Sequence, residues 1–441
     1  MDFIMDRQTF ADLEILEVKG VKKTVFGFFD RAISQGGREA LLDMFYNPLA
    51  DIQKLRERQE LIRYVCKEKL SVPIDKYLFN FIEIYLDTSN KPAFVSRLDA
   101  WHKALKYTLK PTTEYYIIQR GVKNVIEFLQ ELYTYATEHS GKNYPPLLVQ
   151  QLTFIAESIR YTELRRIIGF NTKKIISIMN RERFDHIFRY KEYERLKKIL
   201  KVVYQIDAFH SIADTVAELG LVFPEIIEGN TIEISGLYHL FLKNAVTSDI
   251  RIEENSTVFC ITGANMSGKS TFLKAFGIAV YLAHLGFPVA ASSMRTGVFN
   301  GLFSTINMAD NLNKGYSHFY SEVLRVKNVA EEINRTNHLV VIFDELFRGT
   351  NVKDAFDASL AIISAFAQVK GSVFLVSTHI MEVADQLSKL KNIRFGYFHT
   401  AIEGKTPVYS YHLREGATEE RLGMLIIENE RIVEIITSGS I

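Results

Sequence analysis

Residues 258–277, VFCITGANMSGKSTFLKAFG, run from an apolar stretch through glycine and small polar residues into an amphipathic segment. Within them, residues 263–270 read G-x-x-x-x-G-K-S, and residues 258–261 supply the strand that such a loop must follow. A loop of this form binds oligophosphate, because its backbone N–H groups point into a concave face and the next helix begins with its positive dipole end. The stretch therefore predicts a phosphate-binding loop between a strand and a helix.

The side chains of this loop have predicted roles with a nucleotide. Lys269 is expected to reach the β- and γ-phosphates of ATP, and Ser270 is expected to hold Mg²⁺. The residues expected to surround the nucleotide are Gly263, Ala264, Asn265, Met266, Ser267, Gly268, Lys269, Ser270 and Thr271. ATP and Mg²⁺ are therefore the predicted cofactors.

Two later apolar segments end in polar residues of the kind that a nucleotide site needs. HLVVIFDELFRGT, residues 338–350, reads as a strand that ends in Asp344 and Glu345. Asp344 is expected to help hold Mg²⁺ by contacting the ion's coordination shell, and Glu345 is expected to polarise the attacking water. SVFLVSTHI, residues 372–380, reads as a strand that leads to His379. His379 is expected to sense the γ-phosphate. An acidic pair at a strand end often only caps the next element, but beside a phosphate-binding loop it predicts a hydrolytic site.

Composition limits the classes of protein that remain. The chain has 441 residues and a net charge of +1, which predicts roughly two to four domains and no overall attraction to nucleic acid or anionic membrane. Its two cysteines, Cys66 and Cys260, lack a metal-binding spacing and indicate a reducing compartment. The N-terminus carries acids where a signal peptide needs cations, and no apolar run reaches the ~18 residues of a membrane span. These features favour a cytoplasmic protein without a membrane partner.

The spacing of apolar residues along the chain changes near residue 229. No proline lies between Pro146 and Pro224, and apolar residues recur there at helical spacing. From about Thr231 onward, short β-rich runs alternate with helical segments, which is typical of an α/β sheet. The sequence therefore predicts a helical domain over residues 1–228 and an α/β P-loop ATPase domain over residues 229–441.

Four motifs together resemble the MutS family of mismatch-repair ATPases, within the broader ABC-type class. They are TGANMSGKSTFLK (262–274), INMADNLNKGYSHFYSEV (306–323), IFDELFRGTN (342–351) and VSTHIMEV (376–383), in the family's order and approximate spacing. The resemblance implies that Asn265 belongs to the family's loop and that Ser317 touches the γ-phosphate of the partner subunit's nucleotide. It also implies that Val246 and Thr247, in KNAVTSDI, flank the adenine base.

The N-terminal half resembles the same family, in which helices lead into levers that couple DNA to the ATPase. The similar segments are MDRQTFADLEIL (5–16), GGREALLDMFYNPLADIQKLRERQELIRYV (36–65) and LKKILKVVYQIDAFHSIADTVAELGLVFPEI (196–226). The resemblance thus covers most of the chain and implies an all-α core and lever domain before the ATPase domain.

The chain also departs from the family's pattern. The mismatch-reading domain with its Phe-x-Glu wedge would precede residue 1, the lever region is too short for the usual clamp insertion, and the C-terminal dimerisation module would follow the last residue. Tyr316 stands before Ser317 where a basic residue is common. Mismatch reading therefore lacks its known reader, and dimerisation has less support in the sequence than ATP binding has.

One basic block lies in this otherwise neutral chain. Residues 165–198 hold eleven Lys/Arg against four Asp/Glu, interleaved with Phe170, Phe184, Phe188, Tyr190 and Tyr193. One interpretation is attraction to DNA phosphates through counterion release. The other is an ordinary solvated face of lever helices.

The sequence favours a MutS-like, DNA-dependent ATPase of the mismatch-repair type. It is expected to act as a homodimer that closes with ATP on double-stranded, mismatched or branched DNA, and to work with a downstream repair protein. Two alternatives stay open, namely a DNA-structure binder in recombination and a nucleotide-gated protein scaffold that does not bind DNA. The preferred DNA structure does not follow from the sequence.

Overall fold

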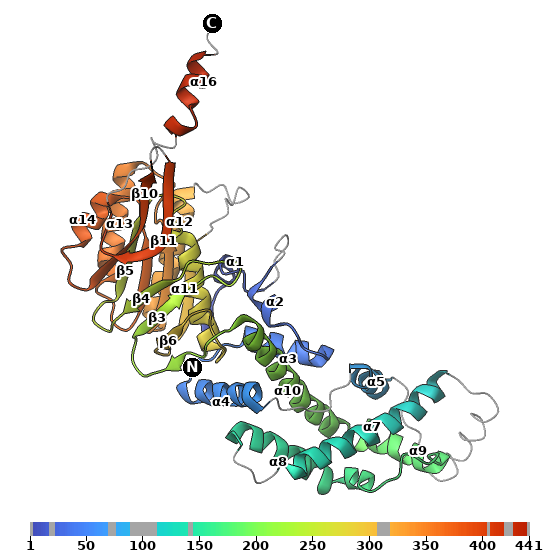
Figure 1. Ribbon diagram of the computed structural model, residues 1–441. Helices are drawn as coiled ribbons and strands as arrows, with labels where there is room; N and C mark the ends of the chain where they lie inside the picture. The colour runs from blue at the N-terminus through green and yellow to red at the C-terminus, as the bar shows by residue number, and fades with distance from the viewer. Residues whose placement is uncertain are drawn as a thin grey trace. The chain divides into compact units, whose positions relative to one another are not determined.

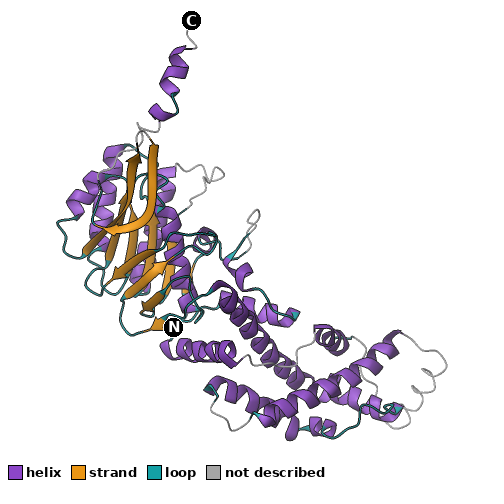
Figure 2. Cartoon of the chain, viewed as in Figure 1, coloured by secondary structure: helices purple, strands orange, loops and turns teal. Residues whose placement is uncertain are grey.

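A computed structural model of the protein describes residues 3–16, 23–68, 76–88, 113–139, 144–306, 318–403, 406–418 and 427–438. The chain divides into two compact units, which are residues 1–28, 47–56 and 219–441, and residues 29–46 and 57–218. All strands of the described residues belong to the first, here called the sheet unit, and the second is called the helical unit (Figure 2). The expected boundary at residue 228 lies near this division at residue 219, and it stays a prediction.

A large sheet lies at the centre of the sheet unit (Figure 1). It has seven strands in the order β1-β7-β8-β9-β5-β10-β11. The strands are β1 (Ile4–Met5), β5 (Val258–Gly263), β7 (Gly301–Thr305), β8 (Leu339–Asp344), β9 (Val373–Ser377), β10 (Ile393–Glu403) and β11 (Thr406–Glu415). All neighbours pair in parallel except β10 and β11. Strands β5, β8 and β9 are buried along their whole length, and for this reason their sequences are unbroken apolar runs rather than alternating ones.

A second sheet of four strands completes the sheet unit. Its order is β2 (Glu225–Ile226), β6 (Ser293–Thr296), β3 (Ile232–Leu237) and β4 (Ser248–Ile252). Strand β4 alternates buried and exposed residues, as expected where one face of a sheet packs on the core.

Helices flank the seven-stranded sheet. They include α1 (Arg7–Asp12), α11 (Lys269–His284), α12 (His318–Arg335), α13 (Val352–Phe366) and α14 (Met381–Leu387), and the last described helix is α16 (Ile432–Ser438). Buried side chains of α12, α13 and α14 form one apolar core with β5, β7, β8 and β9. Within it, the ring of Phe366 stacks on Phe374 at 4.4 Å, which fixes α13 against the sheet.

The N-terminal segment is built into the sheet unit. Strand β1 extends the sheet by pairing with β7. The buried carboxylate of Asp12 accepts hydrogen bonds from Ser304 Oγ at 2.9 Å and from the Ile306 N–H at 2.8 Å. The end of β7 is therefore held by residues nearly 300 positions earlier in the sequence.

The helical unit contains only helices, turns and loops among its described residues. Its helices are α3 (Gln35–Tyr46), α5 (Lys76–Leu86), α7 (Thr113–Glu138), α8 (Pro146–Arg160), α9 (Ile178–His186) and α10 (Tyr193–Leu219), while α4 (Ile52–Glu68) has residues in both units. The buried Asp207 of α10 accepts hydrogen bonds from the Ile33 and Ser34 N–H groups, which fixes the start of α3. No helix in the described ranges is both long and apolar enough to cross a membrane.

Candidate functional site

The predicted phosphate-binding loop connects β5 to α11. Its two glycines have left-handed backbones, with φ of 144° at Gly263 and 108° at Gly268, which explains why glycine occupies these positions. Gly268 directly precedes the first helical residue, Lys269, so the N–H groups at the start of α11 are directed at the loop. Ser267 is buried, and its Oγ has no hydrogen-bond partner among the described residues. A loop with an unsatisfied buried hydroxyl beside a helix N-terminus fits an anion such as phosphate.

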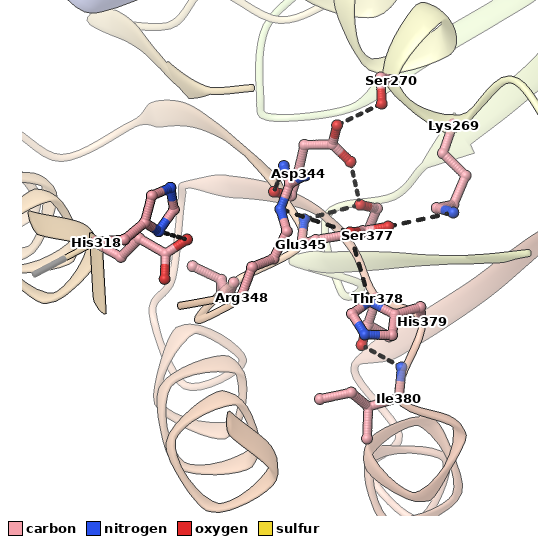
Figure 3. A network of polar contacts seen from close by, with 12 residues as sticks. Lys269, Ser270, His318, Asp344, Glu345, Arg348, Ser377, Thr378, His379 and Ile380 are labelled. Atoms are coloured by element: carbon pink, nitrogen blue, oxygen red, sulfur yellow. Dashed lines mark hydrogen bonds and ion pairs between the residues drawn. The ribbon is translucent and has the colours of Figure 1, made fainter. Parts of the chain in front are cut away.

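The Lys269 side chain reaches back across this loop. Its Nζ donates to the carbonyl oxygens of Gly263 and Ala264, at 2.9 and 3.2 Å, and lies 3.4 Å from Glu345 Oε1 (Figure 3). Only 5% of the side chain is exposed, so this ammonium is held inside the site by acceptors on both sides.

The two residues predicted for Mg²⁺ are in contact. Asp344, the last residue of β8, accepts from Ser270 Oγ through one carboxylate oxygen and from Ser377 Oγ through the other (Figure 3). Neighbouring parallel strands place these groups together, because β8 and β9 end at the same edge of the sheet. No group of three or more metal-binding side chains occurs in the described part of the chain. One hydroxyl and one carboxylate suit Mg²⁺, which takes most of its other ligands from phosphates and water.

Glu345 lies in a cluster of cationic groups. Its Oε2 is 3.5 Å from His379 Nδ1 and 3.6 Å from Arg348 Nε, and its Oε1 faces Lys269. The hydrogen bond from His379, with Lys269 and Arg348, lowers the pKa of Glu345 to about 2 against the opposing effect of burial. Glu345 also has a φ of 54°, which is uncommon for a residue other than glycine and typical of functional sites.

The structure brings together five of the predicted site residues: Lys269, Ser270, Asp344, Glu345 and His379. Asn265, Met266 and Thr271 line the same cavity, and so does Val246. Thr247 is not among the cavity's lining residues, and its carbonyl oxygen lies 3.0 Å from His412 Nδ1. Ser317 lies outside the described residues, so its predicted contact with a partner subunit stays a prediction.

The cavity has a volume of about 800 Å³, and its lining contains two chemically different kinds of side chain. The polar ones are the Lys269 ammonium, the Asp344 and Glu345 carboxylates and Arg348. The lining also contains Tyr238, His239, Leu242 and Tyr411. Burial lowers the pKa of His239 to about 4, so its ring is neutral and presents an uncharged surface. A cavity lined by both aromatic and charged groups suits a nucleotide, which has a base and phosphates.

The sequence alone did not identify Tyr238, His239, Arg348 and Tyr411. Arg348 lies three residues after Glu345, and its position in ELFRGT was the one available signal. Tyr411 lies on β11, more than 140 residues after the loop in sequence, and has a φ of 55°. Only the folded sheet places it beside Gly268, where an added Cβ would lie 3.3 Å from the Tyr411 ring.

The basic block of the helical unit has two parts. Arg181 and Arg189 are buried. The Arg181 guanidinium lies 4.2 Å from the centre of the Tyr115 ring, and Arg189 forms a paired hydrogen bond with Asp185. The aromatic residues Phe184 and Phe188 are also buried and stack on each other. These members of the block therefore serve the helical core.

The exposed cations of the block lie around the loop before α9 and farther along the chain. They are Arg165, Arg166, Lys173, Lys174, Arg183, Lys191, Arg195 and Lys198. Ile175 lies in the same loop and is 96% exposed. A contact with phosphates is therefore open to the exposed cations only.

Comparison with known proteins agrees with this geometry. Residues 259–438 match the family model of MutS domain V. The chain is similar to the DNA mismatch repair protein MutS of Persephonella marina, with 30% identity over 247 residues that cover 55% of this chain and 28% of the relative. It is also similar to the DNA mismatch repair protein MutS of Aquifex pyrophilus, with 28% identity over 336 residues that cover 73% of this chain and 38% of the relative.

The chain thus spans well under half the length of these curated relatives. The longer of the two matches extends beyond the residues of domain V, because it covers nearly three quarters of this chain. The expected resemblance is confirmed: residues 259–438 match the family model of MutS domain V, and the chain is similar to MutS proteins over 55% to 73% of its length.

Proposed function

We propose that the chain binds ATP with Mg²⁺ in the cavity of the sheet unit and hydrolyses it. The observation that carries this proposal is the contact between the loop lysine, Lys269, and the strand-end carboxylate, Glu345, with Ser270 and Asp344 paired beside them. Phosphate-binding and water-activating groups thus lie within one site. The two free cysteines, Cys66 and Cys260, support a cytoplasmic setting for this activity.

Lys269 has two alternative partners in this mechanism. In the structure its ammonium is bound by loop carbonyls and by Glu345. Phosphate oxygens carry more charge than these acceptors and draw the ammonium away. The pKa of Glu345 then rises from its low value, because one of the cations that lowered it has moved. Glu345 becomes a stronger base at the moment when the substrate is bound.

The groups around Glu345 position the reaction. His379 and Arg348 hold the carboxylate from one side, and each can also donate to a phosphate oxygen. Ser270 and Asp344 would hold Mg²⁺, which neutralises charge on the phosphates when bound. The ring of Tyr411 and the neutral ring of His239 offer faces on which the base can stack.

Nucleotide binding tests the first part of the proposal. A fluorescent ATP analogue titrated with Mg²⁺ should bind the wild-type protein, and Lys269→Ala should weaken that binding at least about tenfold, the scale of a lost charge-assisted contact. Lys327→Ala is a control, because Lys327 does not line the cavity and its side chain is 66% exposed. Equal binding by wild type and Lys269→Ala would place the nucleotide elsewhere.

We further propose a DNA mismatch repair-type role, in which ATP closes a homodimer on DNA. The names of the relatives support the DNA substrate, and the exposed cations Arg165, Arg166, Lys173, Lys174 and Arg183 supply phosphate contacts in the helical unit. The proposed dimer contact is Ser317, the residue that directly precedes α12.

A binding titration separates this role from its alternatives. Homoduplex, mismatched and branched DNA should each be titrated at low salt, with and without ATP. Preference for a mismatch supports the repair role, and preference for a branched form supports recombination. If no DNA form binds at low salt, the protein is a nucleotide-gated scaffold for another protein.

A further inference from the structure

We propose that Glu322 is a positioning residue that fixes the turn bearing Glu345 and Arg348 against the start of helix α12. This inference rests on the proposed ATPase function and deepens it. Glu322 lies in the first turns of α12, four residues after His318, and is not among the residues that line the nucleotide cavity. It acts on the reaction through the backbone of the turn that follows β8.

The carboxyl of Glu322 is buried between α12 and this turn. Its side chain is 8% exposed, and its Oε1 lies 3.5 Å from His318 Nδ1. The other oxygen, Oε2, is buried and has no hydrogen-bond partner among the described residues. Burial raises the pKa of Glu322 although His318 and the backbone of Arg348 and Gly349 act against it. A polar group kept at this cost has a role beyond packing.

The turn fits closely on the first residues of α12. A Cβ added at Gly349 would lie 2.7 Å from the backbone nitrogen of Phe319 and 2.9 Å from His318 Nδ1. The ring of Phe319 packs on Phe347 of the turn at 5.7 Å. Phe347 has a φ of 63°, an uncommon conformation that persists only when its surroundings impose it. The two surfaces therefore have no room to move independently.

A second cavity, of about 480 Å³, lies where α12 meets this turn. Glu322, His318 and Thr305 line it from one side. Glu345 and Arg348 line both this cavity and the nucleotide cavity. The turn thus borders both cavities, whereas Glu322 borders only the second.

The consequence is a mechanical link between two parts of the proposed site. Helix α12 begins at His318, and Glu322 lies one turn further along it. Glu322 transmits a shift of that turn to the backbone of Arg348 and Gly349, and so to Glu345. Hydrolysis then depends on the position of α12, whereas nucleotide affinity depends on the loop.

Three variants test the link: Glu322→Leu, Glu322→Gln and, as control, Glu331→Leu. Glu331 lies on the same helix, where its half-exposed side chain pairs only loosely with Lys327. The first readout is backbone hydrogen exchange over residues 345–351 in the nucleotide-free protein. We expect Glu322→Leu to accelerate exchange there at least about fivefold, and Glu331→Leu and Glu322→Gln to leave it unchanged, because an amide keeps the size of the carboxyl and an oxygen that accepts hydrogen bonds.

The second readout is ATP hydrolysis. Glu322→Leu should lower kcat about tenfold or more and change the Kd for ATP less than about threefold, while Glu322→Gln keeps kcat within about threefold of wild type. If Glu322→Leu does not fold, Gly349→Ala replaces it, because the added Cβ separates the same two surfaces and predicts the same exchange and the same loss of kcat.

The outcomes separate the two proposals. Unchanged exchange over residues 345–351 in a folded Glu322→Leu or Gly349→Ala protein overturns the link, whatever the ATPase activity is. A kcat loss in Glu322→Gln with unchanged exchange also overturns it, because the residue then acts through its charge. A wild-type protein that hydrolyses no ATP refutes the proposed function alone, since hydrogen exchange still decides whether Glu322 holds the turn.

Discussion

Glu345→Gln is the perturbation for which the structure gives a magnitude. The surrounding groups lower the pKa of this carboxyl from 4.5 to about 2. That difference corresponds to about 3 kcal/mol of preference for the ionised form. His379 provides the largest share, and Lys269 and Arg348 provide the rest. Losing one ion pair of this kind, with Lys269 Nζ 3.4 Å from Glu345 Oε1, should cost the wild-type protein about 1 kcal/mol when Lys269 is released to the phosphates.

The substitution should therefore separate binding from chemistry. Glu345→Gln no longer retains Lys269, so ATP should bind about fivefold more tightly, the factor for about 1 kcal/mol. Turnover should fall about 10²-fold or more, the scale of losing a positioned base. The assay is a fluorescent ATP titration followed by phosphate release at saturating ATP. Glu331→Gln, on the exposed face of α12, is the matched control.

Two results would refute this reasoning. Wild-type turnover in Glu345→Gln removes the base role. Weaker ATP binding by Glu345→Gln would show that the carboxylate does not compete with the phosphates for Lys269. If Glu345→Gln lowers turnover and leaves the affinity for ATP unchanged, Glu345 still acts as the base but does not compete with the phosphates for Lys269.

Three further predictions concern stability, dimerisation and DNA. Because the pKa of Glu345 is lowered in the folded protein, its ionised carboxylate stabilises the fold fully above pH 4.5, and this stabilisation is lost as the pH falls toward 2. Over that range, urea unfolding should show that the free energy of unfolding falls by up to about 3 kcal/mol more in the wild type than in Glu345→Gln. Equal losses of unfolding free energy in the two proteins would show that the surrounding cations do not stabilise the Glu345 carboxylate. Mixing Ser317→Ala with Lys269→Ala subunits should restore part of the ATPase activity, whereas no recovery despite proven subunit exchange means self-contained sites. Lys173→Glu with Lys174→Glu should flatten the salt slope of log K by about 0.9 for each contacting cation removed, and an unchanged slope identifies a solvated helix face.

The composition of the basic block also determines which of its residues suit such a test. Arg181 looked equivalent to Lys173 in the sequence, but its side chain is only 3% exposed and contacts Tyr115. A glutamate at Arg181 would leave a buried carboxylate, at a cost of about 3 kcal/mol or more. Its effect on DNA binding would then report unfolding of the helical unit. The sequence could not distinguish the two cations, because Tyr115 lies 66 residues earlier.

The phosphate-binding loop was open to prediction because its requirements are local. Gly263 and Gly268 need left-handed backbones, and the strand and helix that flank them leave their own short-range patterns. Asp344 and Glu345 could be placed near the loop for a related reason. Parallel strands end at one edge of a sheet, so a polar residue at the end of a buried apolar run has a predictable neighbourhood.

Contacts between distant segments were not open to prediction. Tyr411 reaches the cavity because β11 pairs with β10 and β10 pairs with β5. Residues 3–16 join the sheet unit through β1 and through Asp12, which binds the end of β7. Neither segment carries a periodic or motif signal for this position, because the partners are set by the folded sheet. The same holds for Glu322, whose burial depends on a turn that follows β8.

The most direct test of the central claim is the rate of phosphate release from Mg²⁺-ATP by the purified wild-type chain and by Lys269→Ala, each with and without duplex DNA at low salt. The account predicts steady hydrolysis by the wild type, a rate that duplex DNA changes, and no hydrolysis above background by Lys269→Ala. Equal rates from the two proteins, or no hydrolysis by the wild type under any of these conditions, would contradict it.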